Sequence, residues 1–476
     1  MHNAYNEVSG FADAASRIKL NYLWGMEKDL QCVEELLWGR HPPQHLYRNQ
    51  LEFLSIKQLA HAKRLAKSHT ELGSFIMSEQ VSHARARCLK CGKTGKCKPQ
   101  RAHLHVTGVP CVHHSELGKK EGFDGKDTLV FYIWARHRSQ TLEPVWVLEN
   151  VEKFGIAECQ RLLGQWYVIE RVLIDTRIHG WRSTRSRQFL VGKLRGLHLE
   201  IIEFHPYTSC SDLIAHQCKR QITADFTVDS YMIATEAELE LERKWALTRP
   251  HVKTRRQEEL VPGHRAYEFR NDPVDSFEYC LTSRERWWLN MNPGDLIIDL
   301  GQSGRPIIGN AAICLFTLVS GMGLVWVGRC NRWMTKEELA LSQGWPISQE
   351  HVAAAMGCLC HLSYDNPTPC PKRTRASAVR QVGNAMFTPS IGSVMHSISM
   401  RFPKLLCMDL SIMDVDKSNK QLESCKPLTR GISVSPSSAV PTCAIPSVSG
   451  QSPMGNTLRA FGAVVAQGRN LRRRLS

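Results

Sequence analysis

The chain is short of the features that mark secreted and membrane-spanning proteins. Its first residues, Met1-His2-Asn3-Ala4-Tyr5, lack the basic and then apolar segments of a signal peptide. The uncharged stretch at residues 307–328 is divided by Ser320-Gly321, which favours two buried strands around a turn over a membrane helix. The 17 cysteines are an odd number without regular spacing, as expected for free thiols in a reducing compartment. We therefore expect a soluble protein with no membrane partner.

Acidic residues are scarce relative to basic ones. The chain has 45 Asp and Glu against 61 Lys and Arg, a formal net charge of +16, and favours a nucleic-acid partner. After about Asp416 the chain is rich in Ser, Pro and Gly, and no acidic residue follows Glu423. We predict that residues 406–476 form a basic disordered tail, ending in Arg472-Arg473-Arg474.

Apolar strands alternate with amphipathic helices over much of the remaining chain. Leu142–Val151 and Arg187–Gly192 are typical of strands, and Asp127–Arg138 is typical of a helix. This alternation predicts an α/β fold with a parallel sheet that is covered on both faces. The rhythm stops between residues 194 and 293, which we interpret as a smaller inserted domain. Residues 1–193 and 294–405 are then the two parts of the main domain.

Chemically capable side chains follow successive apolar stretches. Cys111 comes just after Leu104–Thr107, Glu149 lies at the end of the next strand, and Arg185 and Arg187 lead into another. Strand ends in open α/β sheets meet in the crevice that binds ligands. A nucleophile, an acid and fixed cations at that crevice are a candidate active site, although a lone buried cysteine is more often structural.

The order of these motifs resembles the cytosine-C5 methyltransferases that use S-adenosylmethionine. The matching blocks are Gly108-Val109-Pro110-Cys111, Glu149-Asn150-Val151, Arg185-Ser186-Arg187, Arg332-Trp333-Met334-Thr335 with Glu338, and Gln381-Val382-Gly383-Asn384-Ala385. The resemblance implies a doubly wound, Rossmann-like methyltransferase sheet, with a target-recognition domain at residues 194–293. It also implies methyl transfer to C5 of cytosine in DNA.

The resemblance assigns a role to each candidate residue. Cys111 would add to C6 of a cytosine flipped out of the helix, which makes C5 nucleophilic. Glu149 would bind the N3 edge of the base, and Arg187, with Arg185 behind it, would stabilise charge on the base carbonyl. One alternative is the same reaction on tRNA, but the Cys-Phe-Thr signature of that branch is absent. A second is a catalytically dead, nucleic-acid-binding fold.

The cofactor-binding motif departs from the family. Of the Gly-rich turn only Ser9-Gly10 remains, with Ala12 and Asp13 where glycines are usual. Glu27 resembles the acid that binds the ribose hydroxyls, whereas Gln50 or Asn49 stands where an acid would contact adenine. Pro110, beside the cysteine, and Asn384 would complete an S-adenosylmethionine site. A divergent working enzyme and a decayed copy both fit these departures.

Three cysteines form a separate pattern, C-x2-C-x5-C, at Cys88, Cys91 and Cys97. His103 and His105 follow closely, but a single C-x2-C pair without a fixed fourth ligand does not specify a metal site, so we predict none and keep the three cysteines as candidates.

Basic and aromatic residues of the inserted region suit nucleic acid, although the tryptophan pair suits a core equally well. They include Arg255, Arg256, Arg284, Arg286 and Trp287-Trp288. We expect a nuclear monomer.

Overall fold

The computed structural model describes part of the chain. The described residues are 2–9, 19–28, 33, 43–65, 68–79, 86–92, 96–115, 118, 120–125, 127–197, 209–221, 228–247, 296–299, 308–310, 315–318, 324–344, 382–402 and 405. The chain divides into two compact units, residues 1–422 and 423–476, and all described residues belong to the first.

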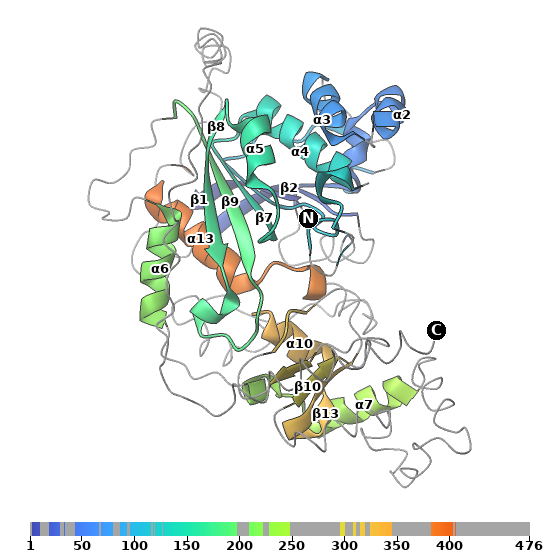
Figure 1. Ribbon diagram of the computed structural model, residues 1–476, viewed down its shortest axis with the longest axis vertical. Helices are drawn as coiled ribbons and strands as arrows, with labels where there is room; N and C mark the ends of the chain where they lie inside the picture. The colour runs from blue at the N-terminus through green and yellow to red at the C-terminus, as the bar shows by residue number, and fades with distance from the viewer. Residues whose placement is uncertain are drawn as a thin grey trace, which may run out of the picture. The chain divides into compact units, whose positions relative to one another are not determined.

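A seven-stranded mixed sheet forms the centre of this unit (Figure 1), with the strand order β3-β2-β1-β6-β7-β9-β8. The strands are β1 (His2–Ser9), β2 (Lys19–Met26), β3 (His45–Tyr47), β6 (Leu104–Gly108), β7 (Val145–Val151), β8 (Tyr167–Ile174) and β9 (Arg187–Leu194). Strand β2 is parallel to β3, and β6 to β7, whereas β9 is antiparallel to both of its neighbours.

Strand β1 is the main departure from the parallel sheet expected above. It runs antiparallel to both β2 and β6, pairing His2 with Met26 and with Thr107. Only residues 10–18 connect β1 to β2. A parallel connection needs about a dozen residues or more, usually with a helix, so this short connection instead fits a hairpin.

Helices cover both faces of the sheet. In β7, Trp146 and Leu148 face one hydrophobic core with α4 and α5, while Val145 and Val147 face another with α6 and α13 (Figure 1). Alternate residues of a strand point to opposite faces, so the continuous apolar run of β7 fits a sheet buried on both sides. The helices here are α2 (Ile56–Leu65), α3 (His69–Ser78), α4 (Thr128–Thr141), α5 (Ile156–Leu163), α6 (Cys210–Gln221) and α13 (Thr388–Arg401), with 3-10 turns η1 (Gln50–Phe53), η2 (Gly122–Asp124) and η3 (Thr176–His179).

A second, antiparallel sheet lies further along the chain, in the order β11-β10-β12-β13. Its elements are β10 (Leu296–Asp299), β11 (Ile308–Asn310), β12 (Val325–Val327), β13 (Arg332–Trp333), with η4 (Val228–Tyr231), α7 (Glu236–Leu247), η7 (Gly328–Cys330) and α10 (Lys336–Ser342). Both β11 and β12 pair with β10 rather than with each other. The described residues on either side of residue 293, Val228 and Ile297 among them, share one core, and the domain boundary there remains a prediction.

The motif Arg332–Glu338 has a structural role in this second part. The two terminal guanidinium nitrogens of Arg332 donate to the buried Glu338 carboxylate, at 2.8 and 2.7 Å. The backbone N–H groups of Thr335 and Ala234 donate to the same carboxylate, at 2.8 and 2.9 Å. Glu338 thus completes the capping box of α10 and joins it to β13 and to the segment before α7.

Among the residues that the structure describes, no helix is both long and apolar enough to span a bilayer.

Candidate active site

Most of the predicted site residues follow strands that end at one edge of the large sheet. Strands β2, β3, β6 and β7 run in the same direction, because β1 is antiparallel to β2 and β6 alike. Glu27 follows β2, Gln50 follows β3, Pro110 and Cys111 follow β6, and Glu149 lies near the end of β7. The carboxyl edge of the parallel strands therefore gathers them, as in other open α/β sheets.

The central polar contact of this edge joins Glu149 to Arg187. Arg187 pairs with Val151 and Phe189 with Glu149, so Arg187 is the diagonal neighbour of Glu149 across the β7–β9 pair. Its Nε lies 3.1 Å from Glu149 Oε1, and both side chains are only about 15% exposed. On the other side, Gly108 is opposite Glu149, where an added Cβ would lie 3.4 Å from its Oε2. A side chain at position 108 would therefore lie against the carboxylate, and glycine avoids that contact.

Cys111 is half-buried beside this ion pair and feels its charges. Burial raises the pKa of the Cys111 thiol, and the Glu149 carboxylate raises it further, whereas the guanidinium groups of Arg187 and Arg185 oppose them. Burial therefore favours the protonated thiol. The two nearby guanidinium groups favour the reactive thiolate.

Opposite changes in Cys111 reactivity are expected when the two partners are replaced. Glu149→Gln removes a negative charge and should lower the thiol pKa, while Arg187→Ala removes a positive charge and should raise it. In an assay at pH 7.5, a shift of one pKa unit changes the fraction of Cys111 that is thiolate by about tenfold. The rate of alkylation by iodoacetamide changes by the same factor. Peptide mapping would follow this single site, with Cys111→Ala as the blank. Equal rates in the two variants would contradict this electrostatic account.

Arg185 is buried and cross-links distant backbone segments, whereas Arg187 is the cation that contacts Glu149. Arg185 is 3% exposed, and its guanidinium group donates to the backbone carbonyls of Leu318, Gly383 and Ala385. Burial, assisted by the charge of Arg187, lowers the pKa of the Arg185 side chain to about 10. These contacts hold the 383–386 segment, with Asn384, at the carboxyl edge, where Met386 Cε would lie 3.2 Å from a Cβ on Gly108.

Two buried polar residues fix the backbone on either side of Cys111. The Asn150 side-chain amide donates to the Val109 carbonyl at 3.1 Å, which ties the end of β7 to the residue before Pro110. On the other side, the buried His113 ring contacts Glu121 and Asp127, at 2.7 and 3.2 Å. The cysteine is thus held between two anchored points.

The cofactor candidates are only partly brought together. Gln50 is buried, and its Oε1 has no hydrogen-bond partner among the described residues. Asn49 Oδ1 instead caps η1, accepting from the Leu51 N–H at 3.0 Å. Ser9 does not join them: it pairs with Lys19 at the start of β2, at the opposite edge from Glu27. Because β1 runs antiparallel to β2, Ser9 and Glu27 lie at opposite edges of the sheet, and the role of Ser9 in cofactor binding stays a prediction.

The three candidate cysteines lie together, and the histidine beside them is not one of the two that follow them in the sequence. The group is His45, Cys88, Cys91 and Cys97. His103 and His105 are buried elsewhere, His105 against the Trp24 ring. Sequence spacing does not reveal His45, because the pairing of Tyr47 with Cys88 makes the contact across some forty residues of chain.

Several other predicted residues lie outside the described part of the chain. They are Gly10, Ala12, Asp13, Arg255, Arg256, Arg284, Arg286, Trp287, Trp288 and the tail beyond residue 405.

Comparison with known proteins finds distant likenesses among solved structures. No protein-family model and no curated protein matches the chain. Solved structures that resemble it include the S. pombe Dnmt2 methyltransferase, at 12% identity over 80% of this chain and 90% of that one, with a TM-score of 0.36. An Entamoeba histolytica methyltransferase, EhMeth, is 11% identical over 79% and 88%, with a TM-score of 0.37. A putative E. coli prophage DNA modification methyltransferase is 13% identical over 81% and 93%, with a TM-score of 0.40. At these values the likenesses do not assign the chain to a family.

Proposed function

We propose that the chain is an S-adenosylmethionine-dependent DNA (cytosine-5-)-methyltransferase. The observation that carries the proposal is the ion pair between Arg187 and Glu149 at the carboxyl edge, with its charges acting on the Cys111 thiol. The three residues match the family's motifs one by one, and they come from β7, β9 and the turn after β6. A surplus of basic residues suits a polyanionic substrate.

The geometry supports covalent activation of a cytosine. The Cys111 thiolate adds to C6 of the ring, and the electron pair of the C5–C6 double bond becomes available at C5. Glu149 binds the N3 edge and holds a proton there, while Arg187 neutralises charge on the O2 carbonyl. S-adenosylmethionine, when bound, would supply the methyl group to C5 and leave as S-adenosylhomocysteine. The C5 proton then leaves to solvent water, the electron pair of its C–H bond forms the C5–C6 double bond again, and the Cys111 sulfur leaves C6 as a thiolate.

Part of the carboxyl edge fits the cofactor. The buried Gln50 Oε1, without a partner among the described residues, is an acceptor suited to the exocyclic amino group of adenine. Glu27 is half-buried after β2, where a carboxylate can accept hydrogen bonds from ribose hydroxyls. Pro110 and Asn384 lie at the same edge. These four residues are the ones that would hold S-adenosylmethionine.

Gln50→Ala is expected to weaken S-adenosylmethionine binding about tenfold, since a hydrogen bond to a buried acceptor contributes roughly 1–1.5 kcal/mol. Isothermal titration calorimetry would measure the dissociation constant. Gln160→Ala is the matched control, because Gln160 is an exposed glutamine on α5. Equal affinities for wild type and Gln50→Ala would remove Gln50 from the cofactor site.

The position of Ser9 favours a second candidate, a nucleic-acid-binding protein that has lost the cofactor. With β1 reversed, the remnant of the Gly-rich turn starts at the edge opposite Glu27. Such a protein would bind DNA but not S-adenosylmethionine.

One experiment separates these functions. The chain is incubated with S-adenosylmethionine carrying a deuterated methyl group and with duplex DNA or tRNA in parallel, and the digested nucleosides are analysed by mass spectrometry. Labelled 5-methyldeoxycytidine is the expected product. Labelled 5-methylcytidine in tRNA alone would favour the RNA reaction, and neither product together with no cofactor binding would favour the binding protein.

A further inference from the structure

Four metal-binding side chains from three stretches of the chain meet beside β3. His45 is the first residue of β3, Cys88 and Cys91 follow β4 (Ala86–Arg87), and Cys97 ends β5 (Lys96–Cys97). One ligand atom from each, an imidazole nitrogen or a sulfur, lies within 4.8 Å of all the others. Three thiols and one imidazole form a frequent ligand set of structural zinc sites.

The spacing of these atoms fits a single tetrahedral ion. With Zn–S bonds of about 2.3 Å and Zn–N bonds of about 2.0 Å, a tetrahedron has S···N edges of about 3.5 Å. The Nδ1 atom of His45 lies 3.7 Å from Cys88 Sγ and 3.5 Å from Cys91 Sγ. An iron–sulfur cluster with two irons divides its ligands between two metal atoms, which spreads them further apart.

The backbone builds this arrangement by itself. Tyr47 forms an antiparallel bridge with Cys88, and the Leu89 N–H donates to the Leu46 carbonyl at 2.8 Å. Cys97 pairs with Ala86 across the β4–β5 hairpin, which brings it back to the C-x2-C turn. Gly92, directly after Cys91, has a φ of +86°, which glycine adopts without strain. Sheet pairing and turn geometry therefore converge on the same four side chains.

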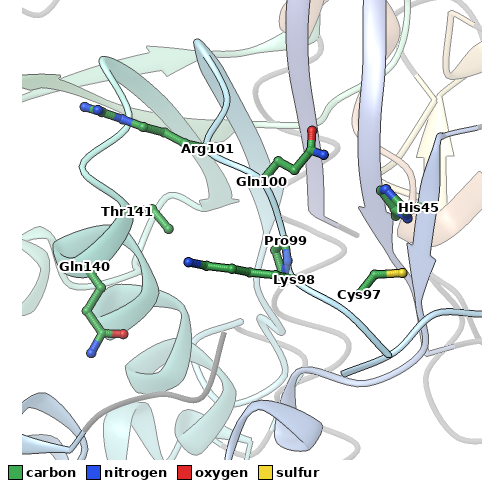
Figure 2. A pocket seen from close by; sticks show the side chains of 8 residues that line it. All are labelled: His45, Cys97, Lys98, Pro99, Gln100, Arg101, Gln140 and Thr141. Atoms are coloured by element: carbon green, nitrogen blue, oxygen red, sulfur yellow. The ribbon is translucent and has the colours of Figure 1, made fainter. Parts of the chain in front are cut away.

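The four side chains differ in exposure. Cys88 is fully buried, His45 and Cys97 are half-buried, and Cys91 is exposed. Figure 2 shows His45 and Cys97 at one end of a pocket. The other residues lining it are Lys98, Pro99, Gln100, Arg101, Gln140 and Thr141. None of these residues is a preferred zinc ligand, so the further ligands of an ion bound here would be Cys88 and Cys91.

We infer that His45, Cys88, Cys91 and Cys97 bind one zinc ion, which fastens the β4–β5 hairpin to β3. With four protein ligands the ion has no open position for a substrate, so its role is structural. The thiolates are required for binding, and the binding free energy adds to the stability of the fold. This inference does not depend on the proposed methyl transfer.

Metal analysis of the full chain tests the inference. The zinc content of protein expressed with added zinc is measured by inductively coupled plasma mass spectrometry. We expect one zinc per chain in wild type and about a tenth of that or less in Cys91→Ser. Cys91 is exposed, so its replacement removes little packing. Cys330→Ser is the matched control, because Cys330 is a half-buried cysteine outside the group and should keep the zinc.

Two further readouts complete the test. Co²⁺ added to the metal-free chain should give the visible bands of tetrahedral thiolate coordination in wild type and in Cys330→Ser, and not in Cys91→Ser. Chelation should lower the melting temperature of wild type but leave that of Cys91→Ser unchanged. Zinc content that is the same in Cys91→Ser and wild type, or wild type that takes up neither metal, would overturn the inference. Each readout is independent of methyltransferase activity, so the zinc inference stands even if the proposed function fails.

Discussion

Cys111→Ala is expected to abolish both methyl transfer and the covalent complex with DNA containing 5-fluorocytosine. A fluorine at C5 cannot leave as a cation, so a working enzyme stalls after methyl transfer with its cysteine bound to C6. Without the sulfur the ring is never activated. Loss of a nucleophile on which the mechanism depends costs on the order of a thousandfold or more in rate.

The covalent complex is measured on a denaturing gel, where the trapped chain migrates with its DNA. Cys330→Ala is the control, since Cys330 is also half-buried and lies in η7, between β12 and β13 of the second sheet. A complex of wild-type strength in Cys111→Ala would rule out Cys111 as the nucleophile. If wild type forms no complex on DNA or RNA although it binds S-adenosylmethionine, covalent catalysis itself is excluded.

Glu143→Ala should destabilise the fold by about 3–5 kcal/mol, because it leaves a buried guanidinium group without its counter-ion. The pair joins Arg138, near the end of α4, to Glu143, just before β7. Both side chains are fully buried, and Arg138 Nη1 lies 2.6 Å from Glu143 Oε1. Glu143 also accepts from the Thr141 hydroxyl, and the Arg138 carbonyl accepts from the Tyr167 hydroxyl. The pair therefore closes the connection from α4 into the strand that carries Glu149.

Urea unfolding of the variants would measure this effect. The double variant Arg138→Met with Glu143→Leu is the informative control, because it removes both charges and keeps apolar volume. The double variant should lose clearly less free energy of unfolding than Glu143→Ala does. Equal losses would mean that packing, and not the unpaired charge, dominates at this position.

The sequence predicted best where one local pattern decides the outcome. The strand expected at Leu142–Val151 is observed as Val145–Val151, and the helix expected at Asp127–Arg138 as Thr128–Thr141. A strand buried on both faces needs a run of apolar residues, and a helix needs its periodic stripe, so both can be identified locally.

Features that depend on pairing between distant segments could not be predicted from local sequence patterns. The direction of strand β1 depends on its partners and on the short connection to β2. Strand β8 (Tyr167–Ile174) has Glu170 and Arg171 in its middle, which hides the strand pattern.

The candidate site divides similarly. Motif order identified Cys111, Glu149 and Arg187, and the structure brings them to one edge. The buried contacts of Arg185 to Leu318, Gly383 and Ala385 could not be predicted, because they link residues more than a hundred positions apart.

Strand β3 is an edge strand, and the β4–β5 hairpin lies on its outer side. Edge strands present unpaired N–H and C=O groups, which can template pairing with other chains. The bridge from Tyr47 to Cys88 and the bond from Leu89 to Leu46 occupy part of that edge. The hairpin therefore shields the sheet from self-association. A chain whose hairpin is released is expected to aggregate at concentrations where its remaining core is still folded, which light scattering would detect before any loss of secondary structure.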